Sequence, residues 1–97
     1  MELVDFEWDS VKSASNLRKH GVSFEVAARV FLDPFRIEAL DEYDESSEDR
    51  WKPIGYVAPA LLVVVYTVRV TEDETIRMIS ARKADAHERA QYGEIQA

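Results

Sequence analysis

The feature that most constrains the fold is a predicted β-hairpin over residues 61–84. Residues 61–65 are aliphatic without interruption, which is typical of a strand covered on both faces at the centre of a sheet. The polar segment 71–75 is short enough to form the loop of the hairpin. The returning strand carries three charges that a plain core strand would lack, namely Arg77, Arg82 and Lys83. We therefore expect a functional site beside this hairpin.

A first helix is predicted over residues 10–20. Asp9 is a favourable N-cap, and Gly21 is a typical residue just beyond the C-terminus of a helix. The apolar side of this helix is thin and consists of Val11, Ala14 and Leu17. Another face carries polar residues at helical spacing, namely Lys12, Asn16 and Lys19.

A second helix is predicted immediately downstream. Ser23 is its N-cap, and the dipeptide Asp33-Pro34 stops it. Its apolar stripe has clean helical spacing and consists of Phe24, Ala27, Ala28 and Phe31. Because only two residues separate the two helices, we expect them to pack as one unit.

The remaining segments complete an α+β pattern. Strands are predicted over residues 4–8, 35–40 and 50–57. Asp85 and Glu88 have the spacing of a capping box, which begins a helix over residues 86–92. We therefore expect the helices on one face of a mainly antiparallel four- to five-stranded sheet, with two N-terminal helices packed on it and a C-terminal helix. The length favours a single domain over residues 1–97.

Composition narrows the class of protein further. The 97 residues include no cysteine, which excludes disulfides, thiolate nucleophiles and cysteine zinc sites. The longest apolar run is far too short to span a membrane, and the acidic N-terminus does not resemble a signal peptide. We therefore expect a cytoplasmic protein that does not contact a membrane.

The charge of the chain is unevenly distributed. A net charge of −7 argues at first sight against nucleic acid binding. Residues 38–49, however, hold seven acidic residues and no basic one, and the remainder balances at twelve acidic against twelve basic residues. A local cationic surface is therefore compatible with the sequence. The ordinary interpretation of the acidic segment is a solvated loop, and the alternative is a lid or a partner-docking strip.

The chemistry that remains is that of a histidine among cations. No glycine-rich phosphate loop or HExxH zinc motif is present, so we expect neither a cofactor nor a metal. His20 and His87 are the residues suited to proton transfer near neutral pH. Cleavage of RNA by its own 2′-hydroxyl needs a base, an acid and positive charge on the phosphate. Arginine suits the last role because it binds phosphate through two parallel hydrogen bonds.

Each candidate residue also has a purely structural interpretation. Lys19 and His20 compensate the helix dipole in any case. Arg82 and Lys83 are equally suited to an ordinary strand end, and Arg77 to a cross-strand ion pair with a carboxylate of the hairpin turn. In a regular strand, Arg77 and Arg82 point to opposite faces of the sheet. Both reach one site only if the strand twists or bulges between them.

Several segments stand in the order and at the spacing of one known family, the BrnT family, which the chain resembles over nearly its whole length. The long segments are FEWD (6–9), NLRKHGVSFEVAARVFLDP (16–34), LLVVVYT (61–67) and IRMISARKA (76–84). Shorter matches are RW (50–51), IG (54–55) and ER (88–89). The pairing of KHGVSFE with ISARKA some fifty residues later makes the resemblance specific.

The resemblance implies a RelE-like ribonuclease toxin of a type II toxin–antitoxin pair, with RNA as its substrate. It also implies a BrnA-type antitoxin with a ribbon-helix-helix domain, which neutralises the toxin and represses their operon. Contact with DNA would then occur only through the antitoxin. A toxin homodimer within a toxin–antitoxin heterotetramer is expected.

The family pattern also indicates which residues form the active surface. The expected catalytic residues are Lys19, His20, Arg77 and Arg82. Substrate contacts are expected from Lys83, Ser80, Tyr66, Tyr92 and Glu88. In this hypothesis His20 is the acid or base and the two arginines clamp the phosphate. Lys19 and Lys83 stabilise charge, and Glu88 caps a helix and orients an arginine.

The chain departs from the family pattern in two respects. Tyr66 stands where many relatives carry histidine, and the acidic balance is unusual for an RNA-binding toxin. Two functions therefore remain open. One is an endoribonuclease that cleaves messenger RNA and inhibits translation. The other is a weakly catalytic partner-binding module that acts as a co-repressor in complex with a DNA-binding antitoxin.

Overall fold

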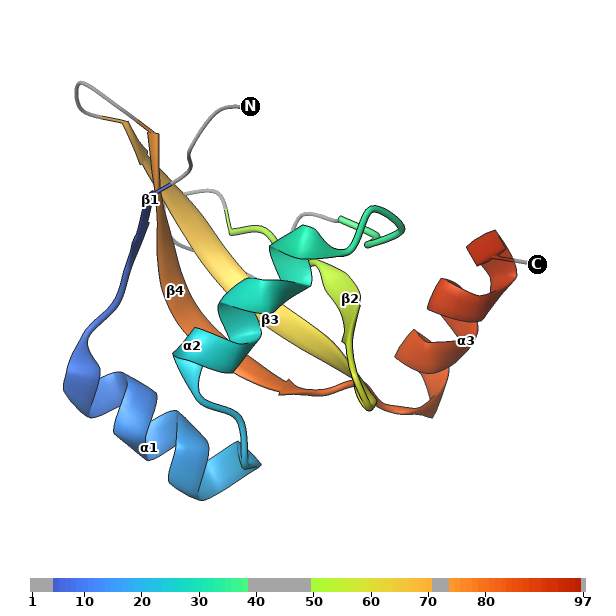
Figure 1. The fold of residues 1–97 in the computed structure, drawn as a ribbon, viewed down its shortest axis with the longest axis horizontal. Coiled ribbons are helices and arrows are strands. Elements are labelled where there is room, and N and C mark those ends of the chain that lie inside the picture. The colour runs from blue at the N-terminus through green and yellow to red at the C-terminus, as the bar shows by residue number, and fades with distance from the viewer. Residues whose placement is uncertain (1–4, 39–49, 71–73, 97) are drawn as a thin grey trace.

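The protein is built around a four-stranded mixed sheet, as a computed structural model describes it for residues 5–38, 50–70 and 74–96 (Figure 1). Along the chain the elements are β1 (Asp5–Glu7), α1 (Ser10–His20), α2 (Phe24–Ala27), the 3-10 helix η1 (Ala28–Leu32), β2 (Ile54–Val57), β3 (Ala60–Val70), β4 (Glu74–Lys83) and α3 (Ala86–Gln96). The strand order is β1-β4-β3-β2. As predicted, β3 is central and pairs with β4 in antiparallel fashion, whereas β1 pairs with β4 in parallel.

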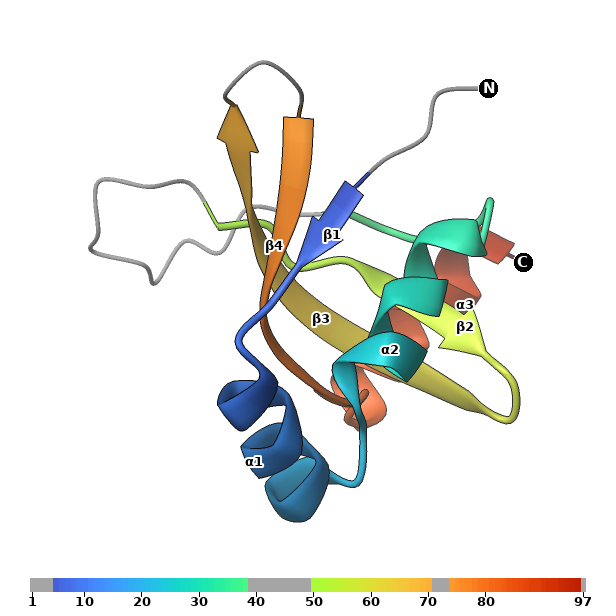
Figure 2. The same cartoon turned by 60° about the vertical axis from the view of Figure 1, so that its left-hand side comes forward.

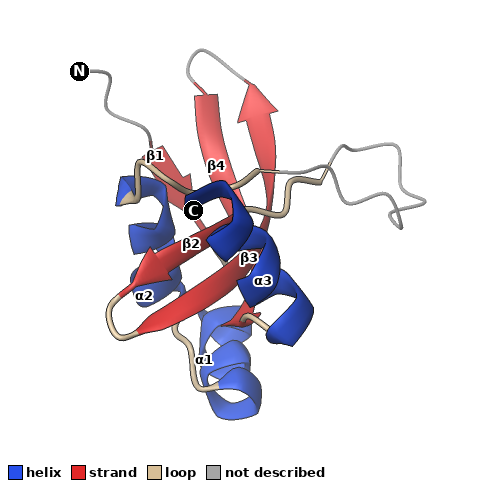
Figure 3. Ribbon diagram, turned by 90° about the vertical axis from the view of Figure 1, so that its right-hand side faces the viewer, coloured by secondary structure: helices blue, strands red, loops and turns tan. Residues whose placement is uncertain are grey.

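The helices lie on both sides of this sheet, which corrects the expectation that they share one face. α2 and α3 cover opposite faces, here called the α2 face and the α3 face (Figures 2 and 3). The core of the α2 face joins helical and sheet residues, namely Val22, Phe24, Ala27, Val30, Leu62, Val64, Met78 and Ala81. A smaller cluster lies on the α3 face and consists of Ile54, Val63 and Ala84, with Leu61 and Tyr92 against it. Both faces of the central strand are therefore covered, as its uninterrupted aliphatic run predicts.

The predicted ends of α1 are confirmed. The Asp9 carboxylate accepts hydrogen bonds from the backbone N–H groups of Val11 (2.8 Å) and Lys12 (3.3 Å). Gly21 ends the helix with φ at 72°, a left-handed conformation that glycine adopts at little cost. The side of α1 that faces the protein is polar, because its buried residues are Ser13 and Asn16.

The second predicted helix is present but is only partly α-helical. Ser23 caps α2 by accepting from the N–H of Val26 (3.2 Å), and the helix tightens into η1 before Asp33 ends it. α3 begins with the predicted capping box. Asp85 accepts from the N–H of Glu88 (2.8 Å), while Glu88 accepts from the N–H of Asp85 (2.9 Å).

Two predicted strands are shorter than expected. In the segment 35–40, the described part makes one isolated bridge, between Ile37 and Ile54, and residues 39–40 lie outside the described residues. In the segment 50–57, only β2 forms a strand, and Trp51 makes an isolated bridge with Tyr66. Pro53 lies between them and lacks the N–H that a continuous ladder needs. Residues 71–73 of the hairpin loop and residues 39–49 of the acidic segment also lie outside the described residues.

Close packing of η1 on β2 yields a stability prediction. A Cβ atom at Gly55 would lie 2.6 Å from Cγ1 of the fully buried Val30, so Gly55→Ala should lower the free energy of unfolding by about 1–3 kcal/mol. Gly93 in α3 has no atom within 4 Å of an added Cβ, and Gly93→Ala should raise stability by about 0.5–1 kcal/mol. Equilibrium urea unfolding measures both values. Wild-type stability of the Gly55→Ala variant would contradict this packing.

Candidate functional site

A β-bulge in β4 determines which cations share a face of the sheet. Val65 pairs with Ser80, but the next residue, Tyr66, pairs with Met78, so Ile79 is an extra residue in β4. Arg77 and Arg82 would otherwise point to opposite faces. With the extra residue between them, both lie on the α3 face. The bulge that the sequence required for a shared arginine surface is therefore present.

α1 covers the edge of β4 next to the bulge. β1 pairs with β4 only as far as Arg77, and α1 lies alongside the following part of that edge (Figure 2). The side chain of Asn16 donates to the carbonyl oxygen of Ala81 (2.8 Å) and accepts from its N–H (3.2 Å). Its amide also donates to the carbonyl oxygen of Val22 (2.8 Å), just after the helix. This buried carboxamide fixes α1 against the bulged strand.

A pocket of about 240 Å³ lies where α1 meets the bulge. Its lining residues are Lys12, Ser15, Asn16, Lys19, His20, Ile79 and Ser80. Three predicted site residues, Lys19, His20 and Ser80, are thus brought together from segments sixty residues apart in the chain. The pocket offers an imidazole, two hydroxyl groups, a carboxamide and two ammonium groups.

Further cations lie beside this pocket on the α3 face. Arg82 follows Ser80 by two residues on the same face, at a Cα separation of about 7 Å. Trp51 pairs with Tyr66 and Ile54 with Val63, and this register places Lys52 opposite Val65, the partner of Ser80. We call His20, Lys19, Ser80, Arg82 and Lys52 the candidate site. Arg77 lies on the same face beyond the bulge and does not line the pocket.

Glu88 holds two of these cations in place. Its carboxylate accepts two hydrogen bonds from Arg82, at 2.6 and 2.8 Å, and lies 3.4 Å from the Nζ atom of Lys52. The Glu88 side chain is only 7% exposed, whereas those of Arg82 and Lys52 are 38% and 37% exposed. The hydrogen bonds from Arg82 lower the pKa of Glu88 to about 2, against the effect of burial. Glu88 is therefore a buried anchor that leaves both cations accessible.

Arg77 is held in a similar but more exposed pair. Glu7 accepts hydrogen bonds from Arg69 (3.0 Å) and from Arg77 (3.3 Å). The bond from Arg69 is the main cause that lowers the pKa of Glu7. Arg77 thus makes an ion pair with a carboxylate of β1. The turn carboxylates Glu72 and Asp73, with which its structural interpretation expects a pair, lie outside the described residues.

Three predicted substrate contacts lie away from the pocket. Tyr66 pairs with Met78 on the α2 face, where its hydroxyl group donates to Glu38 (3.2 Å) and burial raises its pKa to about 12. The register places Lys83 on the same face, opposite Leu62. Tyr92 donates to the carboxylate of Asp33 (2.7 Å) and, as burial also raises its pKa to about 12, remains protonated. Tyr66, Lys83 and Tyr92 are thus not part of the candidate site.

Sequence reasoning missed Lys52 and the role of Asn16 as an anchor. Lys52 stands in a segment whose face depends on the register around Pro53, which the residues alone do not specify. The sequence predicts that Asn16 shares one polar face of α1 with Lys12 and Lys19, and the structure shows that this face is turned toward β4. The polarity of this face, beside a thin apolar side, is the sequence signal that indicates a polar contact between α1 and the sheet.

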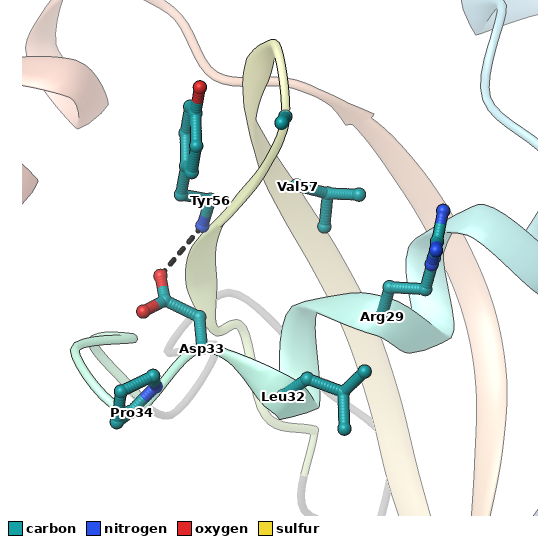
Figure 4. Close-up of a pocket in the computed structure, with 7 residues that line it drawn as sticks. Arg29, Leu32, Asp33, Pro34, Tyr56 and Val57 are labelled. Atoms are coloured by element: carbon teal, nitrogen blue, oxygen red, sulfur yellow. Dashed lines mark hydrogen bonds between the residues drawn. The ribbon is translucent and has the colours of Figure 1, made fainter.

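A larger cavity of about 390 Å³ lies elsewhere, at the outer edge of β2 (Figure 4). Its lining residues are Arg29, Leu32, Asp33, Pro34, Tyr56, Val57 and Ala58. Asp33 accepts from the N–H groups of Phe35 and Tyr56 and from Tyr92, and these bonds lower its pKa although burial opposes them. The carboxylate therefore has a structural role, because its hydrogen bonds link the end of η1 to β2 and α3. The cavity lining also contains no histidine. Size alone therefore does not identify the site.

Comparison with known proteins identifies the family of the chain. Residues 8–88 match the family described as the ribonuclease toxin BrnT of type II toxin–antitoxin systems. The chain belongs to this family. Among solved structures, it is similar to the ribonuclease toxin BrnT of Brucella abortus, with a TM-score of 0.61 and 22% identity, over 86% of this chain and 99% of that one. Comparison with curated protein sequences found no match.

The BrnT-family assignment makes this chain a ribonuclease toxin of a type II toxin–antitoxin system, which implies an RNA substrate and an antitoxin partner. Within the described residues, acidic and histidine side chains nowhere gather in a group that could hold a metal ion. The helices described here also lack the length and apolar character needed to cross a bilayer.

The anchored cations predict a pH dependence of stability. Because the pKa of Glu88 is lowered from its ordinary 4.5 to about 2, its carboxylate stabilises the fold above about pH 5, and this contribution is lost as the pH falls toward 2. Glu88→Gln should lower the free energy of unfolding at pH 7 by about 2 kcal/mol and flatten its dependence over that range. Urea unfolding from pH 7 to pH 2.5 measures both effects.

Glu25→Gln, at an exposed position in α2, is the matched control and should keep the wild-type dependence. A Glu88→Gln variant that loses stability in acid as steeply as the wild type would contradict the role of this carboxylate.

Proposed function

We propose that the chain is an endoribonuclease that cleaves messenger RNA without a metal and thereby inhibits translation. The 2′-hydroxyl of a ribose attacks the adjacent phosphate and the 5′-oxygen leaves. The observation that carries this proposal is the meeting of His20 from α1 with Ser80 from β4 in a pocket beside Arg82 and Lys52. These groups match the needs of the reaction, which are proton transfer and positive charge at the phosphate.

Each group has a definite role in this mechanism. His20 transfers a proton, either from the attacking hydroxyl or to the leaving oxygen. Lys19 and Arg82 stabilise the charge that builds on the phosphate oxygens, and Lys52 binds a neighbouring phosphate. Ser80 donates a hydrogen bond. Arg77 extends the cationic face, so that it contacts the RNA and does not clamp the scissile phosphate.

The partner in this proposal is a BrnA-type antitoxin with a ribbon-helix-helix domain. The antitoxin neutralises the toxin and supplies the contacts of the complex with operator DNA. Two toxins and two antitoxins form a heterotetramer. The reaction takes place in the cytoplasm, where messenger RNA is found. A RelE-like classification agrees with a mixed sheet that presents cations on one face.

Catalysis is tested by substitutions in the candidate site. His20→Asn and Arg82→Lys should each lower the rate of RNA cleavage by about 10²–10⁴-fold in the presence of EDTA, and His20→Asn should abolish growth arrest in cells. The product of wild-type cleavage should carry a 2′,3′-cyclic phosphate. Arg29→Lys, on the other side of the sheet, is the control. Growth arrest that survives both site substitutions would contradict the assignment.

RNA binding is tested separately through Lys52. With a single-stranded RNA methylated at every 2′-hydroxyl, Lys52→Gln should reduce the slope of log K against log salt concentration by about 0.7, the contribution of one phosphate contact. Arg29→Gln removes the same charge away from the site and should leave the slope unchanged. Equal slopes for wild type and Lys52→Gln would remove Lys52 from the RNA-binding surface.

A specific observation favours a second function, that of a weakly catalytic co-repressor. On the α3 face, Arg82 already binds the carboxylate of Glu88, and Arg69 and Arg77 both bind that of Glu7, while the net charge of the chain is −7. Ion pairs of this kind weaken the attraction of RNA. In that case expression of the chain alone would not arrest growth, whereas removal of the chain would weaken operator binding by the antitoxin.

A further inference from the structure

The outward side of α1 is apolar. Val11 is 72% exposed, Leu17 is 50% exposed and Ala14 is also exposed, although together they form the apolar side of the helix. The residues that α1 buries against the protein are Ser13 and Asn16. A surface helix of a globular protein normally has the opposite arrangement, with its apolar stripe inward. The inverted orientation is enforced by the hydrogen bonds of Asn16 to β4.

The same helix is also strongly basic. α1 contains Lys12, Arg18 and Lys19 and no acidic residue, in a chain whose net charge is −7. Arg18 follows Val11 by seven residues and therefore lies almost directly above it on the helix surface. The outward side thus combines apolar side chains with a cation, and its electrostatic complement is an acidic surface with apolar residues.

This outward side adjoins the candidate site. Lys12 and Lys19 line the pocket, and helical geometry places both within about 120° of Val11 and Arg18 around the helix axis. A protein segment that lies on Val11 and Arg18 therefore reaches the rim of the pocket. Its acidic groups would pair with Lys12 and Lys19 and exclude phosphate from them.

We propose that the outward side of α1, formed by Val11, Ala14, Leu17 and Arg18, is the docking surface for an acidic, apolar segment of the antitoxin. The segment seats its apolar residues on the exposed stripe and covers the pocket with its carboxylates. The docking surface follows from exposure and charge, whereas the blocking of catalysis by docking rests on the proposed function.

Charge decides against a second copy of the chain as the occupant. In a two-fold symmetric dimer the same surface meets itself. Two copies of α1 would then bring three cations against three cations with no acidic residue in either helix. An acidic partner removes this repulsion, and it also explains why the toxin leaves apolar side chains exposed on its most basic helix.

The experiment uses charge changes at exposed positions, with the protein encoded next to this chain as the probe. Val11→Glu and Arg18→Glu should each weaken antitoxin binding at least about tenfold, as measured by calorimetry with the purified full-length proteins. Val11→Lys removes the same apolar side chain but introduces a positive charge, which an acidic partner attracts, so it should weaken binding less than Val11→Glu. Glutamate in the first turn of a helix also suits the helix dipole, which protects folding of the Val11→Glu variant.

Leu32→Glu and Arg29→Glu are the matched controls. Leu32 is 80% exposed and, like Arg29, belongs to η1, away from α1. Both control variants should bind the antitoxin as the wild type does. In cells, Arg18→Glu should still arrest growth but should no longer be rescued by co-expressed antitoxin. This combination separates the two proposals, because a failed ribonuclease hypothesis shows as absence of arrest without antitoxin.

Three results would overturn the docking proposal. The first is wild-type antitoxin affinity in both α1 variants. The second is an equal loss of affinity in the control variants. The third is a toxin dimer, seen by light scattering, that Val11→Glu dissociates while antitoxin binding is unchanged, since the stripe would then be a contact between copies of the toxin.

Discussion

The carboxamide of Asn16 is the interaction on which the functional geometry depends. β1 stops pairing at Arg77, and from there the N–H and carbonyl groups of Ala81 would face the sheet edge without a partner. Asn16 supplies one donor and one acceptor to the backbone of Ala81 and a further donor to the carbonyl oxygen of Val22, all from a buried position. A buried polar group left unpaired costs about 1–3 kcal/mol, so the helix is held in one orientation. His20 and Lys19 reach the bulge as a consequence.

The bulge and the carboxylates then arrange the charges. The extra residue Ile79 turns Arg82 to the same face as Arg77, and Glu88 fixes Arg82 and Lys52 from a buried position. A guanidinium group has five N–H donors, of which Glu88 engages two, so donors remain for a phosphate. The buried carboxylate holds the two cations rigidly, and it also cancels part of their positive charge. Because the cations are more exposed than the carboxylate, the face is still locally cationic in a chain whose net charge is −7.

Local signals in the sequence predicted the elements well. The caps at Asp9 and Ser23 and the Asp85–Glu88 box depend only on neighbouring residues, and all three are present. The central position of β3 followed from its aliphatic run. In contrast, the orientation of α1 depends on a hydrogen bond between residues 65 positions apart, which no local pattern reports.

The candidate site was only partly predictable for the same reason. Lys19, His20 and Ser80, which belong to the expected active surface, line one pocket. Tyr66 and Lys83 lie on the other face because side chains alternate along a strand, and the bulge that resets this alternation in β4 is set by tertiary packing. The alternation of side chains in a regular strand predicted that an irregularity must lie between Arg77 and Arg82 if both reach one site, but it did not predict at which residue.

The central claim is that α1 and the α3 face of the sheet together form one RNA-cleaving site. The most direct measurement is a crystal structure of the protein with a short RNA in which a 2′-deoxynucleotide replaces the reactive ribose. We expect the unreacted phosphate between His20 and Ser80, with Arg82 and Lys52 contacting that phosphate or its neighbour. RNA bound on the α2 face, or with its phosphates remote from His20, would contradict this account.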